Sequence, residues 1–393
     1  MIGLYLHVPY CTVRCSYCDF YLVTGRGRDL GAYARALTAE IAAAADAGVE
    51  APGPAAINSA ARSPADTIHL GGGTPSLLPA AALRPVLEAA LRFCPPSGPA
   101  EIALEANPED LDAGTIDLWR TAGVTRLAIG VQSFDDARLR LMRRPHDAAR
   151  AAQSVSRARA AGFASVGVDL ILGMPGARPD PTLDDVARAI DLGVDHLSLY
   201  LLEIHPGTRL GRAVALGKEA PLEADAAASV YEAAADRLIA AGFEHYEISN
   251  FARPGHRSRH NLKYWTDEEY LGFGPSAHSY LGGERWSNPP DLAGYLARGG
   301  VGSKRLDDPQ PRATRGWEAL SAGLRLLEGV DLDQLEARYP GAMPAGGDTT
   351  IEALVSAGFM TIAGRRLALT RRGRLVSNEL FERLEPKRSG RIS

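Results

Sequence analysis

Residues 7–20 of this chain read HVPYCTVRCSYCDF, which places Cys11, Cys15 and Cys18 at C-x3-C-x2-C spacing directly after a short apolar run. Three thiolates this close in one loop can hold three corners of a four-iron, four-sulfur (4Fe-4S) cluster and leave the fourth iron without a protein ligand. A structural zinc ion would need a fourth protein ligand, and no suitable side chain stands at a usual spacing. The spacing therefore favours a 4Fe-4S cluster, with a zinc site as the alternative.

The amino-acid composition indicates a well-packed protein of two unequal parts. Of the 393 residues, 46% are hydrophobic and 23% are charged, which is enough to bury one large core and a smaller one. The formal net charge of -4 gives no basic field for phosphate backbones, so we expect no nucleic-acid partner. No apolar run approaches the roughly 20 residues of a membrane span, and the N-terminus lacks the basic region of a secretory signal. With three of the four cysteines in one loop, the sequence predicts a cytoplasmic metal protein.

Short apolar runs rich in β-branched residues alternate along the chain with longer segments of helical period, which is typical of repeated strand-helix units. The candidate strands cover residues 3–8, 67–70, 101–105, 126–131, 165–172 and 196–202. The candidate helices cover residues 30–45, 80–93, 113–122, 148–161, 183–192 and 224–241. Crossovers of this length predict an α/β protein with a parallel sheet.

Six such units favour a partial (β/α)6 TIM-like barrel over an open dinucleotide-binding sheet, because no G-x-G-x-x-G follows the first strand. We expect this barrel to occupy residues 1–250. Residues 46–66 are rich in Ala, Gly, Pro and Ser and carry little pattern, so they are interpreted as a flexible insertion in the first crossover.

The remainder of the chain predicts a connecting segment at 251–308, a small module at 309–385 and a tail at 386–393. The module alternates helical segments with a candidate hairpin near residues 360–370, which is typical of a winged-helix-like domain. Such modules often bind nucleic acid, but this one lacks a basic face.

Polar residues and glycines follow several candidate strands. Gly72, Gly73 and Thr74 end the second strand, and polar side chains close the next three strands. In a barrel, the carboxyl ends of the strands form the functional face, so these groups could converge on one ligand. The residues that close or follow the third, fourth and fifth strands are Glu105, Gln132, Arg144 and Asp169.

At this point the chain resembles the radical-SAM superfamily, whose cysteine motif has this form and whose usual fold is a partial barrel. The further motifs that carry the resemblance are Tyr5, GGGTP at 71–75, EANP at 105–108, GVQSF at 130–134 and DLILGMPG at 169–176. They are similar to the motifs of one branch, which contains the oxygen-independent coproporphyrinogen III oxidases and the haem chaperones of the HemW family. The match runs from about residue 1 to residue 384, interrupted mainly at 46–66.

The resemblance implies that S-adenosylmethionine binds to the open iron of the cluster. The implied contacts are Tyr5, Tyr17, Gly72, Gly73, Thr74, Glu105, Gln132, Arg144 and Asp169. Within this set, Tyr17 fits the aromatic position against the adenine, and Arg144 fits the ligand of the carboxylate. Glu105 and the two glycines fit the ammonium group, whereas Gln132 and Asp169 fit the ribose hydroxyls.

Two features favour the chaperones over the oxidases within this branch. The oxidases normally carry a fourth cysteine two residues beyond the third, and this chain has Phe20 there. The oxidases also have a long N-terminal arm ahead of the cluster, whereas here Cys11 stands close to the start of the sequence. Both departures put decarboxylation of a porphyrinogen in doubt.

Residues 259–265, RHNLKYW, are similar to the H-N-x-x-Y-W motif of the haem chaperones, and residues 272–278, GFGPSAH, follow. The resemblance implies haem contact by His260, Asn261, Tyr264 and Trp265. An imidazole can ligate haem iron, and aromatic rings offer flat surfaces for a porphyrin. The alternative for these residues is a core-facing aromatic pair beside a capped histidine.

The sequence thus predicts a haem chaperone that carries a 4Fe-4S cluster and S-adenosylmethionine and passes haem to acceptor haem proteins such as cytochromes. The expected further partner is an electron donor such as a flavodoxin or ferredoxin; a homodimer is left open, and membrane association is expected to be transient at most. The competing prediction is a coproporphyrinogen III oxidase that generates a 5'-deoxyadenosyl radical before decarboxylation. A third alternative is a zinc-stapled structural or nucleic-acid-binding protein.

Overall fold

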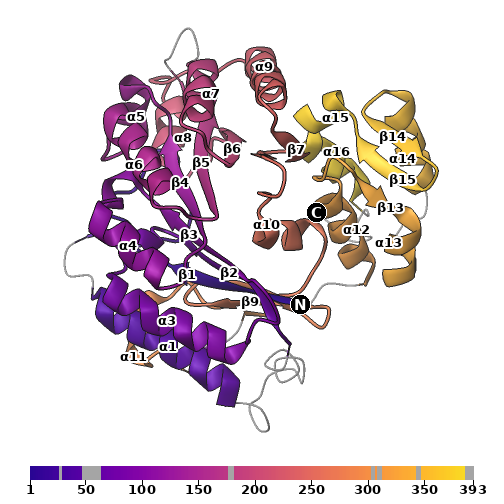
Figure 1. The fold of residues 1–393 in the computed structure, drawn as a ribbon. Coiled ribbons are helices and arrows are strands. Elements are labelled where there is room, and N and C mark those ends of the chain that lie inside the picture. Colours follow the sequence, from indigo (N-terminus) through magenta and orange to yellow (C-terminus); the bar gives the residue numbers. More distant parts are fainter. Residues whose placement is uncertain are drawn as a thin grey trace.

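The computed structural model describes residues 1–25, 29–46, 63–175, 181–301, 306–307, 312–341 and 347–385. Most of the expected insertion at 46–66 and the whole expected tail at 386–393 lie outside the described residues. Figure 1 shows two parts, a large one with a curved sheet inside a layer of helices and a smaller one formed by the end of the chain.

Six parallel strands follow one another in chain order across the sheet, and helices make the crossovers between them. The strands are β1 (Ile2–Val8), β2 (Ala65–Gly72), β3 (Glu101–Ala106), β4 (Arg126–Gln132), β5 (Ser165–Leu172) and β6 (His196–Leu201). The helices are α1 (Leu30–Asp46), α3 (Ala80–Phe93), α4 (Ala113–Thr121), α5 (Asp136–Met142), α6 (Ala148–Ala160), α7 (Thr182–Asp191), α8 (Arg209–Ala215) and α9 (Ala224–Ala240). The predicted α/β fold with a partial barrel is confirmed.

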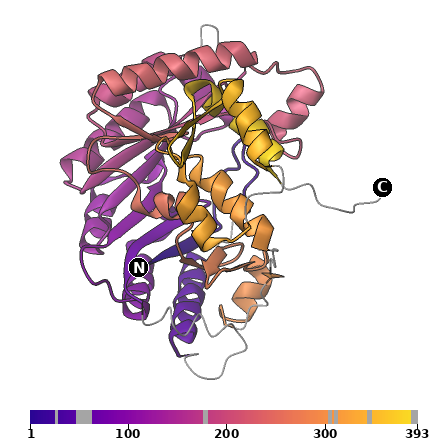
Figure 2. The ribbon, with the colours of Figure 1, turned by 90° about the vertical axis from the view of Figure 1, so that its right-hand side faces the viewer.

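The parallel strands are buried along most of their length, which explains their nearly continuous apolar sequences. In β1, for example, Leu4, Leu6 and Val8 are fully buried. The helices cover the outer side of the sheet, as Figures 1 and 2 show, and leave the carboxyl ends of the strands to form one face. Within the described ranges, no helix combines the length and apolarity that a bilayer crossing demands.

The sheet extends beyond the six parallel strands at both edges. In the described part of the chain, β7 (Glu244–Glu247) and β8 (Asn250–Ala252) follow β6, and β9 (Tyr270–Phe273) pairs in parallel with β1. The further elements are β10 (His278–Leu281), β11 (Glu284–Ser287), β12 (Leu306–Asp307), α10 (Arg259–Trp265) and α11 (Leu292–Ala297). The expected connecting segment at 251–308 therefore contributes strands to the sheet, although the proposed domain boundaries themselves stay a prediction. These strands are two to four residues long, too short to show a clear sequence period.

A half-buried carboxylate, Glu40 on α1, fixes the added strands to the barrel. Its Oε2 accepts hydrogen bonds from the amide of Gly274 at 2.7 Å and the hydroxyl of Tyr295 at 2.8 Å, and its Oε1 accepts one from Asn288 at 2.8 Å. Burial raises the pKa of Glu40 to about 7, although these three hydrogen bonds favour the ionised form. One side chain thus holds the loop after β9, the loop after β11 and helix α11.

The end of the chain forms a small unit with its own apolar core. Its elements are α12 (Arg312–Gly323), β13 (Val330–Asp331), α13 (Leu332–Arg338), α14 (Gly347–Ser356), β14 (Met360–Ala363), β15 (Arg366–Leu369), α15 (Arg371–Leu375) and α16 (Ser377–Leu384). The strands pair in the order β13-β15-β14, packed against the helices. The predicted winged-helix-like C-terminal domain is thus confirmed.

Polar contacts join this C-terminal unit to the barrel. Asp267, a buried residue at a φ of 55°, accepts hydrogen bonds from Tyr280 and Tyr339 and pairs with Arg338 at 3.0 Å. On the other side of the unit, Arg371 pairs with Asp236 of α9 at 2.8 Å. The unit therefore sits against α9, α10 and the added strands (Figure 2).

We predict that Glu40→Ala lowers the free energy of unfolding by about 3 kcal/mol, because three donors lose a shared acceptor in a partly buried site. The folded-state pKa of Glu40 lies above its ordinary value of 4.5. Its contribution to stability is therefore complete below pH 4.5 and declines as the pH rises through about 7. Urea unfolding of both proteins at several pH values measures this difference.

The matched control is Glu88→Ala, which removes an exposed carboxylate from the neighbouring helix α3. We expect its free energy of unfolding to stay within about 0.5 kcal/mol of wild type. Equal effects of the two substitutions would contradict the role given to Glu40.

Candidate functional site

The cysteine loop lies between β1 and α1, at the carboxyl ends of the strands. Cys11 is buried, and Cys15 and Cys18 are half-buried. Burial raises the pKa of the Cys11 thiol to about 11, and the neighbouring Cys15 and Cys18 add to the rise. The three thiols are thus close enough to interact with one another. The backbone amide of Cys11 donates to the carbonyl of Val23 at 3.1 Å, which closes the loop at its base.

A chain of hydrogen bonds links the first two cysteines through the ends of other strands. The Sγ of Cys11 lies 3.2 Å from Oγ1 of Thr74, to which Nδ2 of Asn107 donates at 3.3 Å. Arg144 donates through Nη2 to Oδ1 of Asn107 at 2.6 Å and through Nη1 to Sγ of Cys15 at 3.4 Å. The loop is therefore anchored to the segments that follow β2, β3 and α5.

The donor set of this loop fits a 4Fe-4S cluster. Three cysteine sulfurs from one loop are its usual ligands, and the guanidinium group of Arg144 beside Cys15 suits the negative charge that thiolates bring. In the part of the chain that the structure describes, no three His, Cys, Asp or Glu side chains meet the spacing that a single metal ion needs.

The residues predicted to bind S-adenosylmethionine lie on the same face as the loop. Gly72 has a φ of 110°, and a Cβ on it would lie 2.7 Å from the ring of His7, so a side chain there would displace this histidine. Gln132 has a φ of 67° at the end of β4, a conformation that non-glycine residues adopt rarely and that is common at binding sites. Among the described residues, Nε of Arg144 is buried and has no hydrogen-bond partner, which fits an acceptor group of a ligand.

Two carboxylates face the interior of the barrel. Glu105 accepts a hydrogen bond from Nε2 of His69 at 3.0 Å. Burial raises the pKa of Asp169 to about 6, and the negative charge of Glu105 adds to the rise. Tyr5 completes this wall, since its ring stacks on His69 with centroids 6.0 Å apart. The structure thus brings Tyr5, Glu105 and Asp169 together, and their contact with S-adenosylmethionine stays a prediction.

Tyr17 lies in a small apolar cluster separate from the main core. The cluster contains four buried residues: Met142 at the end of α5, Ile171 near the end of β5, Met174 just after β5, and Leu210 in α8. Tyr17 is also close enough to Cys15 that the charge of this thiolate raises the pKa of its hydroxyl, after burial as the larger cause. An apolar patch with an aromatic ring beside a cluster ligand fits the predicted contact with adenine.

The predicted haem motif forms helix α10, and its residues point to different places. His260 is fully buried, with Nδ1 2.8 Å from Oγ1 of Thr67 and Nε2 2.9 Å from the hydroxyl of Tyr264. Burial holds the pKa of His260 well below its ordinary value, so its ring is neutral. Haem ligation by His260 stays a prediction, and in this arrangement it would require one of the two hydrogen bonds to break.

The other three residues of the motif are spread along the short helix. Tyr264 lines a cavity on the inner side of the barrel. Trp265 instead lies under Arg325 of the C-terminal unit, 4.5 Å from its guanidinium carbon to the ring centre. Asn261 stands in the first turn, where its amide donates to the capping hydroxyl of Ser258. Haem contact by Asn261 and Trp265 stays a prediction.

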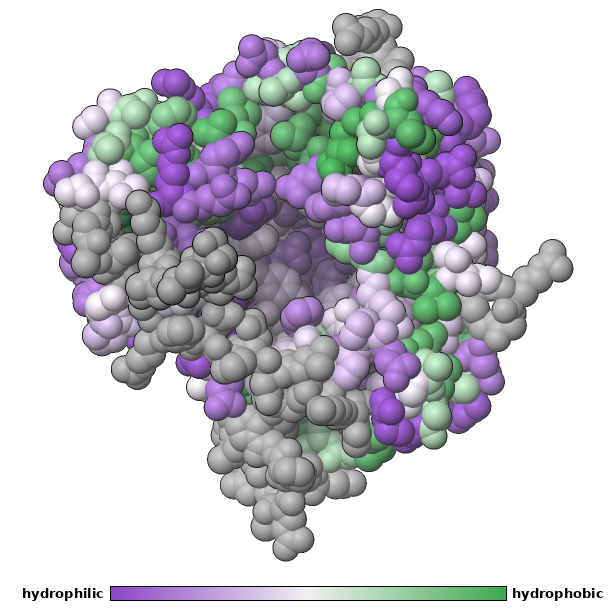
Figure 3. All heavy atoms as spheres, turned by 180° about the vertical axis from the view of Figure 1, so that it is seen from behind, coloured by the Kyte–Doolittle hydropathy of each residue, from purple (hydrophilic) through white to green (hydrophobic). Residues whose placement is uncertain are grey.

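A cavity of about 380 Å³ opens on the inner side of the barrel, and we call it the lumen cavity. Phe20 and Tyr21 from the cysteine loop line it on one side, and Tyr264, Tyr270 and His278 line it elsewhere. Sequence reasoning missed Tyr270 and His278, although GFGPSAH at 272–278 marked their region. The face seen in Figure 3 is hollowed in its middle, with hydrophilic residues in the depth of the hollow.

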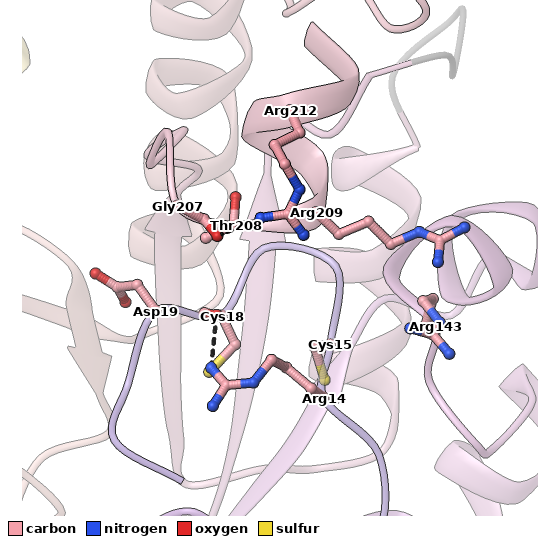
Figure 4. A pocket seen from close by; sticks show the side chains of 9 residues that line it. All are labelled: Arg14, Cys15, Cys18, Asp19, Arg143, Gly207, Thr208, Arg209 and Arg212. Carbon is pink, nitrogen blue, oxygen red and sulfur yellow. Dashed lines mark hydrogen bonds between the residues drawn. The ribbon is translucent and has the colours of Figure 1, made fainter. Parts of the chain in front are cut away.

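A second cavity, of about 390 Å³, lies at the cysteine loop itself (Figure 4). Four exposed arginines surround Cys15 and Cys18 there, and we call them the arginine collar: Arg14, Arg143, Arg209 and Arg212. They come from the loop, the end of α5 and helix α8. Sequence reasoning missed this group, because its members come from three segments that are far apart in the sequence.

The chain is similar to known protein families and to proteins of known name. Residues 5–189 match the model of the radical SAM superfamily, and residues 311–376 match the HemN C-terminal domain. The chain is 37% identical to a haem chaperone HemW of Mycobacterium tuberculosis, over 97% of this chain and 94% of that protein. It is 31% identical to the haem chaperone HemW of Bacillus subtilis, over 97% of this chain and 98% of that protein.

One solved structure has a similar fold along nearly the whole chain. It is the coproporphyrinogen III oxidase HemN of Escherichia coli, a radical SAM enzyme, with a TM-score of 0.81 and 22% identity over 98% of this chain and 90% of that chain. At this identity the likeness concerns the fold alone.

We predict that Cys18→Ser abolishes cluster assembly, because the serine hydroxyl does not replace a thiolate ligand. Anaerobic reconstitution of wild type should give a brown protein with about four irons per chain, and the variant should stay nearly colourless. Iron and sulfide analysis with absorbance spectra measures this.

Cys94→Ser is the control, since Cys94 is buried at the end of α3 and is not part of the loop. It should assemble the cluster as wild type does. A wild-type protein that takes up zinc and no iron would exclude the cluster altogether.

Proposed function

The chain belongs to the HemW family of the radical-SAM superfamily, and from this premise we propose that it is a chaperone that binds haem and delivers it to haem proteins. The observation that carries the proposal is the lumen cavity. It places the aromatic rings of Tyr21, Tyr264 and Tyr270 beside the cysteine loop, on a scaffold shared with proteins named for haem.

The chemistry of this cavity suits a porphyrin. Its volume of about 380 Å³ lies near the lower end of the range of small-molecule sites, and aromatic rings favour contact with a flat, apolar ligand. Phe20 is 65% exposed beside the cavity, which is unusual for a large apolar side chain. A bound porphyrin would cover part of that surface.

Residues of the strand ends would hold the cofactors. Cys11, Cys15 and Cys18 would ligate the 4Fe-4S cluster, which when bound supplies one-electron chemistry and an open iron for S-adenosylmethionine. The unpaired Nε of Arg144 suits the carboxylate of that ligand, and Tyr17 in its apolar cluster suits the adenine.

The remaining predicted contacts fit the other parts of S-adenosylmethionine. The close backbone approach at Gly72 and Gly73, together with Glu105, suits the ammonium group. Gln132 ends β4, Asp169 lies within the neighbouring strand β5 three residues before its end, and both suit the ribose hydroxyls. Tyr5 and Thr74 support this arrangement through Glu105 and Cys11.

The arginine collar suits an acidic electron donor, of the flavodoxin or ferredoxin kind. Four exposed guanidinium groups surround two cluster ligands, so an acidic surface that docks there comes close to the cluster. Positive charge at a docking surface accelerates association with an acidic partner, chiefly at low ionic strength. The collar gathers positive charge on a chain whose overall formal charge is -4.

Charge reversal of the collar tests this partner. In the double variant Arg209→Glu with Arg212→Glu, we expect the rate of cluster reduction by an acidic flavodoxin to fall about tenfold at low salt, because the electrostatic steering is reversed. The loss should shrink in high salt, and reduction by dithionite should be unchanged. Arg188→Glu, on the exposed side of α7, is the control and should react as wild type. A salt-independent defect would argue against docking at the collar.

Haem titration beside an enzymatic assay tests the proposed function. We expect the protein to retain stoichiometric haem after gel filtration, because the aromatic cavity buries the porphyrin face. It should form no protoporphyrinogen from coproporphyrinogen III with S-adenosylmethionine and a reductant under anaerobic conditions. Turnover without haem retention would instead establish the oxidase.

A further inference from the structure

We propose that His69 is the positioning residue for Glu105 and holds its carboxylate in place for the ammonium group of S-adenosylmethionine. The inference rests on the proposed function and deepens it, because it names the group that orients one of the predicted contacts of this ligand. His69 is not among the contacts predicted from the sequence.

The two side chains meet across neighbouring strands. His69 lies on β2, Glu105 is the penultimate residue of β3, and Nε2 of His69 lies 3.0 Å from Oε1 of Glu105. The side chain of His69 is 11% exposed, whereas that of Glu105 is 40% exposed and lines the lumen cavity. A nearly buried donor thus holds one oxygen of a carboxylate that a ligand can still reach.

The ring of His69 is itself held by its neighbours. It stacks on Tyr5 of β1 with centroids 6.0 Å apart and on His260 of α10 with centroids 5.0 Å apart. His260 in turn is held at both ring nitrogens, since Nδ1 lies 2.8 Å from Oγ1 of Thr67 and Nε2 lies 2.9 Å from the hydroxyl of Tyr264. The donor therefore belongs to a packed group of rings rather than to a mobile side chain.

The surroundings of Nδ1 select the tautomer of His69. In the described structure this nitrogen is buried and has no hydrogen-bond partner. A hydrogen on Nδ1 would be a buried donor without an acceptor, which is costly. The tautomer with its hydrogen on Nε2 avoids this cost and donates to Glu105. The pair therefore presents the carboxylate as an acceptor, which is what an ammonium group requires.

Two features of the wall explain why such a donor matters. Asp169 lies close by: burial raises its pKa to about 6, and the negative charge of Glu105 adds to the rise. This repulsion and the flexibility of a glutamate side chain would favour other rotamers of Glu105. Gly71 leaves room for the pair, since a Cβ there would lie 2.9 Å from Oε1 of Glu105 and 3.1 Å from Cδ2 of His69.

Binding of two ligands to the reconstituted protein tests the assignment. S-adenosylmethionine carries the ammonium group, whereas 5'-methylthioadenosine has the adenosine and the sulfur atom without it. His69→Phe keeps an aromatic ring for stacking but has no donor, so we expect it to weaken binding of S-adenosylmethionine about tenfold. Its binding of 5'-methylthioadenosine should be unchanged. Isothermal titration calorimetry under anaerobic conditions measures both affinities.

Two further variants separate positioning from a purely structural role. His69→Gln should restore most of the affinity for S-adenosylmethionine, because its amide nitrogen can donate near the position of Nε2. In a Glu105→Gln background, His69→Phe should have little further effect, because the carboxylate that it orients is gone.

The matched control is His245→Phe, on the edge strand β7. His245 also stacks on a ring, that of Phe251, with centroids 4.1 Å apart, and its Nε2 lies 3.3 Å from the hydroxyl of Tyr231. This variant should bind both ligands as wild type does. Iron and sulfide content, measured in each reconstituted variant, shows whether the cluster site is intact.

The outcomes separate this inference from the proposed function. If wild type binds S-adenosylmethionine and His69→Phe binds it equally well, His69 does not position Glu105, and the assignment of the ligand stands. Equal losses for both ligands, or a full effect of His69→Phe in the Glu105→Gln background, would also overturn the inference. If wild type with a complete cluster binds no S-adenosylmethionine, that part of the proposed function fails, and the inference fails with it.

Discussion

The hydrogen-bond chain from Cys11 through Thr74, Asn107 and Arg144 to Cys15 is the constraint on which the rest of the site depends. It ties a loop near the start of the chain to residues far along the sequence. A loop without such anchors would sample many conformations, and it would lose that conformational entropy when its three thiols bind one cluster. Because Thr74 and Asn107 closely follow parallel strands, the positions of the cysteines depend on the geometry of the barrel.

The anchored loop separates two environments of opposite character. The side that carries the arginine collar is cationic and open to solvent. The side that faces the lumen is aromatic, with Phe20 and Tyr21 at its edge. A charged partner and a flat apolar ligand can therefore approach the same three cysteines from different directions. This division gives a physical reason for the proposed pairing of an acidic electron donor with haem.

Much of this arrangement could be predicted from the sequence, because its causes are local. The buried strands β1 to β6 are visible in the sequence as apolar runs. The cluster site could be predicted from the spacing of the cysteines, and the close backbone approach from the glycines at 71–73. The position of His260 could not be predicted in the same way. Its ring nitrogens are occupied by Thr67, 193 positions away, and by Tyr264, and a seven-residue helix gives no period from which to decide its buried face.

Other features escaped prediction because they depend on contacts between distant segments. Glu40 looks like an ordinary helix carboxylate until the loops after β9 and β11 close around it. The strands β9 to β11 are too short for a sequence period, so the placement of Tyr270 and His278 on the lumen cavity followed from the pairing of β9 with β1. In each case the role of the residue depends on tertiary contacts, which a local sequence pattern does not contain.

The seam between the barrel and the C-terminal unit has a further consequence. It combines ion pairs that have partly exposed members, such as Arg371 with Asp236, with backbone hydrogen bonds from Ile248 to Arg325 and from Leu327 to Tyr246. Exposed pairs contribute little to stability, and dissolved salt screens them over about 10 Å. High salt should therefore weaken the contact of Arg371 with α9, while the backbone hydrogen bonds keep the C-terminal unit against the sheet.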